Sequence, residues 1–359
     1  MIKKNNNILI LYNCITHYRI PVFNELGKEY KVTIIHSGKK IKNKNDLFKE
    51  VIVPSYQLGP FIFQPNLLTE NLNHYDVIIG LADIRWFNIL LTMFLKKKSQ
   101  KFIYWGAWLT SNNIANYIRL FLINHLIDCQ ILYCKKIRDQ FLINGAKKEK
   151  LFVANNTIDV GSGYRSYESK IKNKIIFVGS LDPRKQLNQV INAFKNVIEY
   201  IPNGIDFVII GEGFCKENLE SQVKELGLTH RIFFKNNIND FENLKRYYKE
   251  SIFAISYGQA GLSVLQAFGF GVPFITKKES ISGGEKYNIK NGENGFLIEN
   301  SKEDLQKKIS SLCNDINYAK LLGEKAYNYY QKYCTIHNMA QGIKDAIQNT
   351  RFSKIDEFK

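Results

Sequence analysis

The chain has 359 residues, which is enough for two domains of ordinary size, and 45% of them are hydrophobic, so each domain can bury a substantial core. No apolar run approaches the roughly 18 residues that a transmembrane helix requires, and the apolar stretch Ile8–Tyr12 is too short for a signal peptide. The six cysteines show neither CxxC nor Cys/His metal spacing, which indicates thiols in a reducing cytoplasm.

The formal net charge is +17, and the surplus is concentrated in the first half of the chain. Residues 1–160 hold 22 Lys or Arg against 11 Asp or Glu. A basic surplus of this kind fits nucleic acid, an anionic membrane face or an anionic substrate. A general enrichment of the chain in Lys, Asn and Ile is the alternative explanation.

The first half begins with a strand–helix–strand pattern. Ile8–Tyr12 and Val32–His36 read as strands, and Ile20–Leu26 reads as the helix between them, so a parallel sheet is expected. The loop after the first strand carries His17 and Arg19. In a doubly wound sheet this loop lies at the carboxyl edge, where ligands bind, so both side chains are candidates for holding a phosphate or an acceptor hydroxyl. A solvated first helical turn is the alternative.

Two apolar helices are expected further along the first half. Trp86–Leu95 is apolar nearly all round, which predicts a buried helix between the strands Asp76–Gly80 and Lys101–Trp105. Ile114–Ile127 is also strongly apolar and has basic residues nearby. A helix of that kind either packs in a core or rests on an anionic bilayer, and the pattern leaves both readings open.

The second half repeats the strand–turn–helix pattern. Lys174–Gly179 predicts a strand entering a glycine turn, and Leu187–Ile198 predicts the helix that follows. The loop between them holds Arg184 and Lys185, which are placed to stabilise negative charge developing on a phosphate. The next predicted strand ends in the turn Gly211-Glu212-Gly213, which is typical of a nucleotide-binding loop or of a plain structural turn.

The most informative stretch is Ser251–Thr276. An apolar strand leads into a turn with glycine at Gly258 and Gly261, then a helix at Leu262–Phe268, a glycine–proline stop and another strand, which together predict a βαβ unit. Small residues in the turn let a ligand approach the backbone, and the helix directs unpaired N–H groups toward it. A diphosphate is the natural occupant of such a turn, and tight packing is the alternative.

The same stretch resembles the retaining glycosyltransferases of the two-domain GT-B type, family 4, whose block reads E-x-F-G-L-x-x-x-E-A followed by G-x-P-V-I. Gly258 and Gln266 stand where that family has the two glutamates of its E-x7-E motif, and Ser180 and Gln186 replace an arginine and a glycine of its phosphate loop. The segments that carry the resemblance follow the family's order: Asn155–Asp159, Lys174–Gln186, Gly211–Gly213, Gly258–Ile275 and Asn294–Ile298.

The resemblance implies an α/β architecture of two Rossmann-like domains facing a central cleft. Residues 1–160 would form the acceptor-binding domain, 161–173 a linker, 174–335 the nucleotide-sugar-binding domain, and 336–359 a helix crossing back to the first domain. It further implies transfer from a UDP- or GDP-sugar to a saccharide, with retention of configuration and without a metal or other cofactor. The acceptor would be a lipid-linked oligosaccharide of lipopolysaccharide, capsule or exopolysaccharide synthesis.

The resemblance also implies roles for individual residues. Lys185, with Arg184 beside it, would bind the diphosphate; Glu285 would replace the carboxylate missing at Gly258; His17 would serve the reacting groups; and Gln266 would bind the ribose hydroxyls. The turns expected to hold the donor through their backbones comprise Gly179, Gly211, Glu212, Gly213, Ala260, Gly261 and Leu262. The family's histidine after the strand Lys101–Trp105 has no counterpart, because Trp105-Gly106 stands there.

The sequence leaves two rival functions. A basic nucleic-acid-binding protein would show basic residues interleaved with exposed aromatics, and no such pattern is seen, so no nucleic-acid partner is expected. An inactive glycosyltransferase homologue would explain the missing glutamates. The expected location is cytoplasmic, with an anionic membrane surface, the inner face of the plasma membrane, as a partner for a peripheral enzyme.

Overall fold

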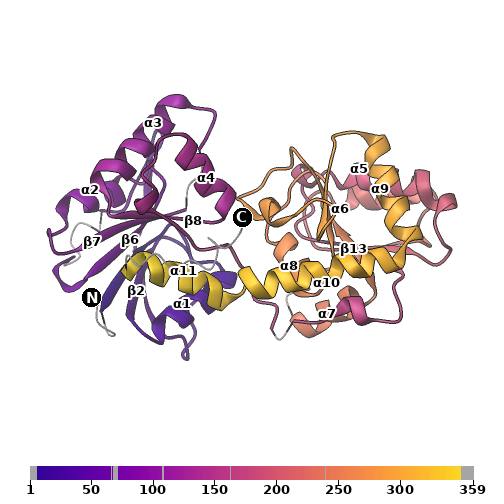
Figure 1. The fold of residues 1–359 in the computed structure, drawn as a ribbon, viewed down its shortest axis with the longest axis horizontal. Helices are drawn as coiled ribbons and strands as arrows, with labels where there is room; N and C mark the ends of the chain where they lie inside the picture. Colours follow the sequence, from indigo (N-terminus) through magenta and orange to yellow (C-terminus); the bar gives the residue numbers. More distant parts are fainter. Residues whose placement is uncertain are drawn as a thin grey trace. The chain divides into compact units, whose positions relative to one another are not determined.

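A computed structural model describes residues 6–65, 67, 72–106, 109–161, 163–238 and 240–348. The chain divides into two compact units (Figure 1): unit 1 contains Met1–Thr157 together with Thr335–Lys359, and unit 2 contains Ile158–Cys334. Both units are parallel α/β folds of the Rossmann type.

Unit 1 is built on a seven-stranded parallel sheet of order β3-β2-β1-β6-β7-β8-β9. Its central strands are buried on both faces, as the near-continuous apolar runs in the sequence require. The order reverses between β1 and β6, which makes their carboxyl ends the switch point of this sheet. The strands are β1 Asn7–Leu11, β2 Lys31–His36, β3 Phe48–Ile52, β6 Val77–Leu81, β7 Lys101–Trp105, β8 Cys129–Leu132 and β9 Leu151–Val153.

Helices cover both faces of this sheet. On one face lie α2 (Phe87–Leu95), α3 (Asn113–Phe121) and α4 (Lys135–Ile143) (Figure 1). On the other face lie α1 (Ile20–Gly27) and α11 (Ile336–Gln348), which pack on each other. A small antiparallel hairpin, β4 (Tyr56–Leu58) and β5 (Phe61–Phe63), follows β3.

Helix α11 belongs to unit 1 although it comes last in the sequence. Its apolar face, which includes Met339 and Ile343, is completely buried against α1 and strands β7 to β9. Lys344, also buried, forms an ion pair with Glu29 at 2.8 Å. The described part of the C-terminal segment therefore completes the core of the first unit; residues 349–359 lie outside the described residues.

Unit 2 contains a six-stranded parallel sheet of order β12-β11-β10-β13-β14-β15, which is the doubly wound order with its switch point between β10 and β13. Its strands are β10 Lys174–Val178, β11 Asp206–Ile210, β12 Ile232–Lys235, β13 Ser251–Ile255, β14 Phe274–Lys277 and β15 Gly295–Ile298. Its helices are α5 Leu187–Val197, α6 Lys216–Glu225, α7 Phe241–Lys249, α8 Ser263–Gly269, α9 Lys302–Asn314 and α10 Ile316–Tyr333.

Two local expectations differ from the structure. Residues 161–173, expected as a linker, lie in unit 2, where Ser166 is buried and its N–H donates to the carbonyl of Phe270 at 3.2 Å. Helix α2, expected to be buried, is covered on one side only: Ile89 and Met93 face the core, whereas Phe94 is largely exposed. An all-apolar sequence cannot distinguish these two faces.

None of the helices in the described part of the chain combines the length and the hydropathy needed to span a bilayer.

Candidate functional site

The loops that follow β10 and β13 meet at the switch point of unit 2. Residues 179–186 connect β10 to α5, and residues 256–262 connect β13 to α8. The N–H of Gly258 donates to the carbonyl of Lys185 at 3.0 Å, which joins the two loops directly. Ligands of doubly wound sheets bind at this place, because the adjacent loops diverge there and leave a crevice at the carboxyl edge.

The Gly211–Gly213 turn packs against the first of these loops. A Cβ atom at Gly211 would lie 1.9 Å from the carbonyl oxygen of Gly179, and one at Gly213 would lie 2.3 Å from that of Leu181. The N–H of Leu181 also donates to the carbonyl of Glu212 at 2.8 Å. The glycines are therefore required by close backbone approach, while the half-exposed Glu212 side chain forms an ion pair with Lys216 at 3.0 Å.

Lys185 is the cation at the centre of this loop cluster. Its side chain is half-buried and runs past Gly179, where a Cβ atom would be 3.9 Å from the lysine Cε. Burial lowers the pKa of Lys185, while the nearby carboxylates of Asp182 and Glu285 oppose that shift. A partly desolvated ammonium group of this kind interacts strongly with an arriving anion.

Arg184 occupies a different position from Lys185. Its guanidinium forms an ion pair with Asp182 at 3.2 Å, and 63% of its side chain is exposed. Asp182 also accepts hydrogen bonds from the backbone N–H of Arg184 and from the Ser180 hydroxyl at 2.7 Å. Ser180 and Arg184 thus both hydrogen-bond the Asp182 carboxylate. The Arg184 guanidinium therefore pairs with a residue of its own loop in this structure.

Gly258 leaves no space for the family's first glutamate. A Cβ atom there would lie 2.2 Å from the carbonyl oxygen of Arg184 and 2.7 Å from the Cγ of Gln186. Glu285 approaches the cluster from another loop, is 5% exposed, and accepts a hydrogen bond from the Ser282 hydroxyl at 3.1 Å. A buried carboxylate within electrostatic reach of Lys185 is therefore present, although not at the motif position.

The glycine turn before α8 has fewer backbone N–H groups available to a ligand than the sequence predicts. The N–H of Ala260 donates to the carbonyl of Ile281 at 2.9 Å, because Gln259 and Ile281 form a parallel bridge that extends the sheet. The prediction that Ala260 gives its amide to a ligand is therefore wrong for this conformation. Within the described residues the amides of Gly261 and Leu262 have no protein partner, and the space around the Gly261 Cα is open.

Gln266, at the position of the family's second glutamate, is buried in α8. Its Oε1 accepts a hydrogen bond from the Tyr248 hydroxyl at 3.2 Å. Tyr248 is itself fully buried and stacks on Phe270 with a centroid distance of 4.7 Å. The Gln266 side chain is thus anchored on its oxygen side by the core.

Sequence reasoning missed a second lysine behind the phosphate loop. Lys277, at the end of β14, donates to the Gln186 Oε1 at 2.9 Å and to the Asn300 Oδ1 at 3.3 Å, and lies over the Tyr257 ring. Gln186 has a φ of +54°, the left-handed conformation that explains the family's preference for glycine there. The signal available in the sequence was the glutamine at the family's glycine position. A non-glycine residue in the left-handed conformation needs support from neighbouring side chains.

The candidates from the first loop lie in unit 1. His17 is exposed, in the 3₁₀ turn that precedes α1, and its ring meets Tyr18 edge-on. Arg19 is buried among aromatic rings, with its guanidinium 5.2 Å from the Trp105 ring centroid and 5.3 Å from that of Tyr133. Arg19 is therefore part of the unit 1 core, and only His17 is presented to solvent.

The described ranges contain no cluster of three or more His, Cys, Asp or Glu side chains arranged to hold a metal ion. The two residues after Gly106, Ala107 and Trp108, lie outside these ranges.

Part of unit 2 is similar in sequence to a known family. Residues 165–329, which include all of the unit 2 site, match the family described as glycosyl transferases group 1. An uncharacterized glycosyltransferase of Methanocaldococcus jannaschii is 24% identical over 85% of this chain and 82% of that protein.

Another relative has an assigned reaction. The alpha-1,4-N-acetyl-D-galactosaminyltransferase of Campylobacter jejuni that is named for GalNAc-alpha-(1->4)-GalNAc-alpha-(1->3)-diNAcBac-PP-undecaprenol is 29% identical over 50% of each chain. Half of that protein is thus matched by this chain.

Among solved structures, Anabaena HepE in complex with UDP and glucose superposes with a TM-score of 0.70 at 15% identity, covering 96% of this chain and 100% of that chain. This likeness establishes the GT-B fold of two Rossmann-like domains. In sequence, residues 165–329 are similar to glycosyl transferases of group 1, and the relatives described above are named as glycosyltransferases.

Proposed function

We propose that this chain transfers a sugar from a nucleotide-diphosphate sugar, UDP- or GDP-linked, to a saccharide acceptor, with retention of configuration. The observation that carries the proposal is the meeting of Lys185 with three glycine-bearing loops at the switch point of unit 2. A cation and open backbone amides at such a point suit a diphosphate.

In the proposed reaction the bond between the anomeric carbon and the β-phosphate oxygen breaks, and negative charge develops on the diphosphate. Lys185, near the turn formed by Gly179, stabilises that charge where it appears. The free amides of Gly261 and Leu262 add hydrogen bonds. The acceptor hydroxyl forms the new bond on the same face of the sugar, and its proton passes to the leaving phosphate.

Two further side chains serve the donor in this proposal. Glu285, buried and near Lys185, binds sugar hydroxyls in place of the glutamate that Gly258 excludes. Gln266 hydrogen-bonds the ribose through its amide group while Tyr248 holds its oxygen. Because Gln266 is neutral, its bond to a hydroxyl is weaker than that of a carboxylate. His17, exposed in unit 1, is proposed to contact the acceptor.

The proposed acceptor is a lipid-linked oligosaccharide of bacterial surface polysaccharide synthesis. The Campylobacter relative, named for an undecaprenol-linked saccharide, supports it, as does the basic surplus of residues 1–160. Such an acceptor would place the protein in the cytoplasm as a peripheral enzyme at the inner face of the plasma membrane.

A screen of UDP-, GDP- and other nucleotide sugars by thermal stabilisation tests the donor proposal, because a ligand that binds only the folded state raises its melting temperature. The stabilising sugar is then tested for turnover with saccharide acceptors, and NMR of the product's anomeric proton tests retention. Turnover that is unchanged by EDTA is expected, because Lys185 supplies the cationic charge.

The rival functions predict other results. An inactive homologue would bind a nucleotide sugar without transferring or hydrolysing it. A nucleic-acid-binding protein would bind DNA or RNA with steep salt dependence and would not be stabilised by any nucleotide sugar.

A further inference from the structure

A basic groove lies at the amino-terminal ends of the first three strands of unit 1. The structure describes residues 37–47, between β2 and β3, as a loop without a helix, and part of this loop lines the groove. The groove has a volume of about 920 Å³, near the upper end of the range for ligand sites. Its lining includes the first residues of β1, β2 and β3 and contains five lysines: Lys31, Lys40, Lys42, Lys44 and Lys49. The groove and the loop that carries His17 are therefore at opposite ends of β1.

Glu50, one of the two carboxylates in the lining, is bonded inside the protein. Its side chain is 3% exposed and accepts hydrogen bonds from the His36 Nε2 at 3.1 Å and from the N–H groups of Ile41 at 3.0 Å and Lys42 at 3.3 Å. The N–H of Gly38 donates to the His36 Nδ1 at 3.0 Å, so His36 is a neutral ring with its proton on Nε2. These bonds hold the first part of the loop in place and use the Glu50 charge away from the lysine side chains.

Asp46, the other carboxylate of the lining, anchors the second part of the loop on α1. It accepts hydrogen bonds from the Asn24 amide at 2.8 Å and from the N–H of Asn43 at 2.6 Å. The Asn24 oxygen in turn accepts the N–H of Leu47 at 2.8 Å. Both carboxylates are thus occupied by neutral donors, and in the part of the chain that the structure describes none of the five lysines has an ion pair.

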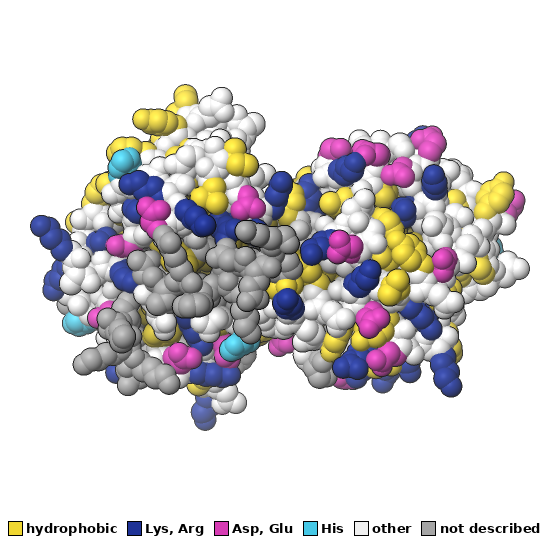
Figure 2. Space-filling view, in the orientation of Figure 1, with side chains coloured by type: hydrophobic (Ala, Val, Ile, Leu, Met, Phe, Trp, Pro, Cys, Tyr) yellow, Lys and Arg dark blue, Asp and Glu magenta, His cyan; other side chains and the backbone are white. Residues whose placement is uncertain are grey.

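Acidic residues next to the lining are engaged as well. Asp76 accepts the N–H of Asn7, which lines the groove, at 2.9 Å. Glu29, two residues before Lys31, pairs with Lys344 at 2.8 Å. Figure 2 shows Lys and Arg side chains projecting from the lower margin of unit 1, on the side where α1 lies in Figure 1. The groove therefore presents cations that the neighbouring carboxylates do not neutralise by direct contact.

The apolar lining residues narrow the choice of anion. Among those that the structure describes, Val32, Phe48 and Tyr75 are buried, and Leu47 is exposed. The buried aromatic rings offer no face on which nucleic-acid bases could stack. One exposed leucine is also too little apolar surface to anchor a protein in a bilayer. A hydrophilic anion therefore fits the groove better than a nucleic acid or a phospholipid surface.

Neutral hydrogen-bonding groups lie among the lysines. Thr33 pairs with Lys49 in the register of β2 and β3, and side chains alternate along a strand, so Lys31, Thr33 and Lys49 share one face of the sheet. Within the described residues the Thr33 hydroxyl and the Asn43 side-chain amide have no hydrogen-bond partner. Ammonium groups bind carboxylates, and hydroxyl and amide groups bind the hydroxyls of sugars. The combination suits a saccharide chain whose sugars carry carboxylates.

We infer that this groove binds an acidic saccharide chain, with the five lysines contacting its carboxylates and Thr33 and Asn43 contacting its hydroxyls. The inference rests on the proposed function, because it takes the ligand to be a saccharide that the enzyme extends or has extended. It deepens that function by naming the class of saccharide. It also gives unit 1 a second contact with a long chain, at the other end of β1 from His17.

Fluorescence anisotropy of labelled oligogalacturonate with the full chain tests the inference. Binding is expected at low salt and should weaken as salt is added, because the contacts are ionic. A labelled maltooligosaccharide of the same length, which has the hydroxyls without the carboxylates, is expected not to bind. The triple variant Lys31→Gln/Lys44→Gln/Lys49→Gln is expected to bind oligogalacturonate at least about tenfold more weakly, because three charged contacts are removed.

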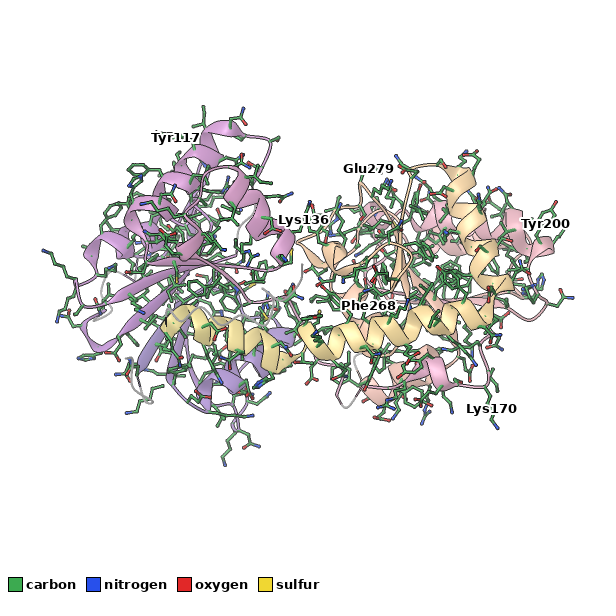
Figure 3. The ribbon with its side chains drawn as sticks, viewed as in Figure 1. Tyr117, Lys136, Lys170, Tyr200, Phe268 and Glu279 are labelled. Carbon is green, nitrogen blue, oxygen red and sulfur yellow. The ribbon has the colours of Figure 1, made fainter. Side chains whose placement is uncertain are left out.

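The matched control is Lys170→Gln/Lys195→Gln/Lys249→Gln, which removes the same charge at exposed positions of unit 2. Figure 3 shows one of these lysines, Lys170, at the margin of that unit. The control is expected to bind oligogalacturonate like the unaltered chain. Melting temperature and UDP titration of both triple variants report folding and donor binding separately. Failure of the proposed function, seen as absence of UDP binding, is thus distinguishable from failure of the groove.

Three outcomes would overturn the inference. One is absence of oligogalacturonate binding at low salt by a chain that still binds UDP. Another is equal binding of oligogalacturonate by the two triple variants. The third is tighter binding of an oligonucleotide or of inorganic polyphosphate than of oligogalacturonate, lost in the groove variant and kept in the control, which would identify a phosphate polymer as the occupant instead.

Discussion

At residue scale, two glycines in one loop have opposite constraints. A Cβ atom at Gly258 would collide with the Arg184 carbonyl oxygen at 2.2 Å, whereas one at Gly261 would meet no atom within 4 Å. Gly258→Ala is therefore expected to lower the free energy of unfolding by about 1–3 kcal/mol, as overpacking does. Gly261→Ala should leave it nearly unchanged. Chemical denaturation of both variants checks this pair, and equal stability would contradict the placement of the Lys185 loop.

The ionisation of Lys185 gives a second prediction at this scale. Burial lowers its pKa, so the ammonium form needed for the diphosphate is lost at a lower pH than for an exposed lysine with a pKa of 10.5. The value of kcat/KM for the donor should therefore begin to fall at a pH below 10.5, as the ammonium group loses its proton. In Lys185→Arg the fall should move to higher pH, because arginine stays charged. An identical alkaline limb in both proteins would assign the titration to another group.

At the scale of elements, Lys277 at the end of β14 contacts residues of the loops that follow β10 and β13. This buried lysine hydrogen-bonds Gln186 and Asn300, and Gln186 holds a left-handed backbone. Lys277→Met should raise the KM for the donor by loosening the loop that carries Lys185. Adding Gln186→Gly should restore part of the loss, because glycine adopts the left-handed conformation without support. Steady-state kinetics of the single and double variants tests the coupling; additive losses would show that the two residues act independently.

Helix α11 provides a second prediction about elements. A Cβ atom at Gly342 would lie 2.3 Å from the carbonyl oxygen of Val153, so this glycine permits the close approach of α11 to the end of β9. Gly342→Ala should destabilise the protein by about 1–3 kcal/mol despite the better helix propensity of alanine. Lys325→Ala, at an exposed position of α10, is the control and should have little effect in urea unfolding. Unchanged stability of Gly342→Ala would show that α11 is only loosely attached.

Much of the element order followed from the sequence, because apolar runs punctuated by glycine predict strands and turns directly. The helix predicted at Leu262–Phe268, for example, begins and ends within one residue of α8. The hydrogen bonds of Lys277 were not predicted, because its partners Gln186 and Asn300 lie 91 and 23 positions away in the sequence. The engaged amide of Ala260 was missed for the same reason: its acceptor, Ile281, lies beyond the next strand.

At the scale of the whole molecule, the sequence predicts two α/β halves because the strand–turn–helix pattern restarts at Lys174. The structure divides the chain slightly earlier, between Thr157 and Ile158. The polar segment 161–173 lacks periodicity, yet it is anchored in unit 2 by backbone bonds such as that from Ser166 to Phe270. Backbone contacts of this kind leave no trace in residue pattern. The sequence also did not predict that the apolar face of α3 is exposed. Periodicity shows that a helix has an apolar side but does not show what covers that side.

Lys185 and the glycine loops of unit 2 are proposed to bind a nucleoside diphosphate. Calorimetric titration of UDP and GDP into the unaltered chain, Lys185→Ala and Arg184→Ala measures it directly. We predict that one nucleotide binds the unaltered chain, that Lys185→Ala weakens it about 10- to 100-fold, as loss of a charged hydrogen bond does, and that Arg184→Ala changes it much less, because Arg184 is exposed and paired with Asp182. Equal affinity of the unaltered chain and Lys185→Ala would show that Lys185 does not bind the diphosphate.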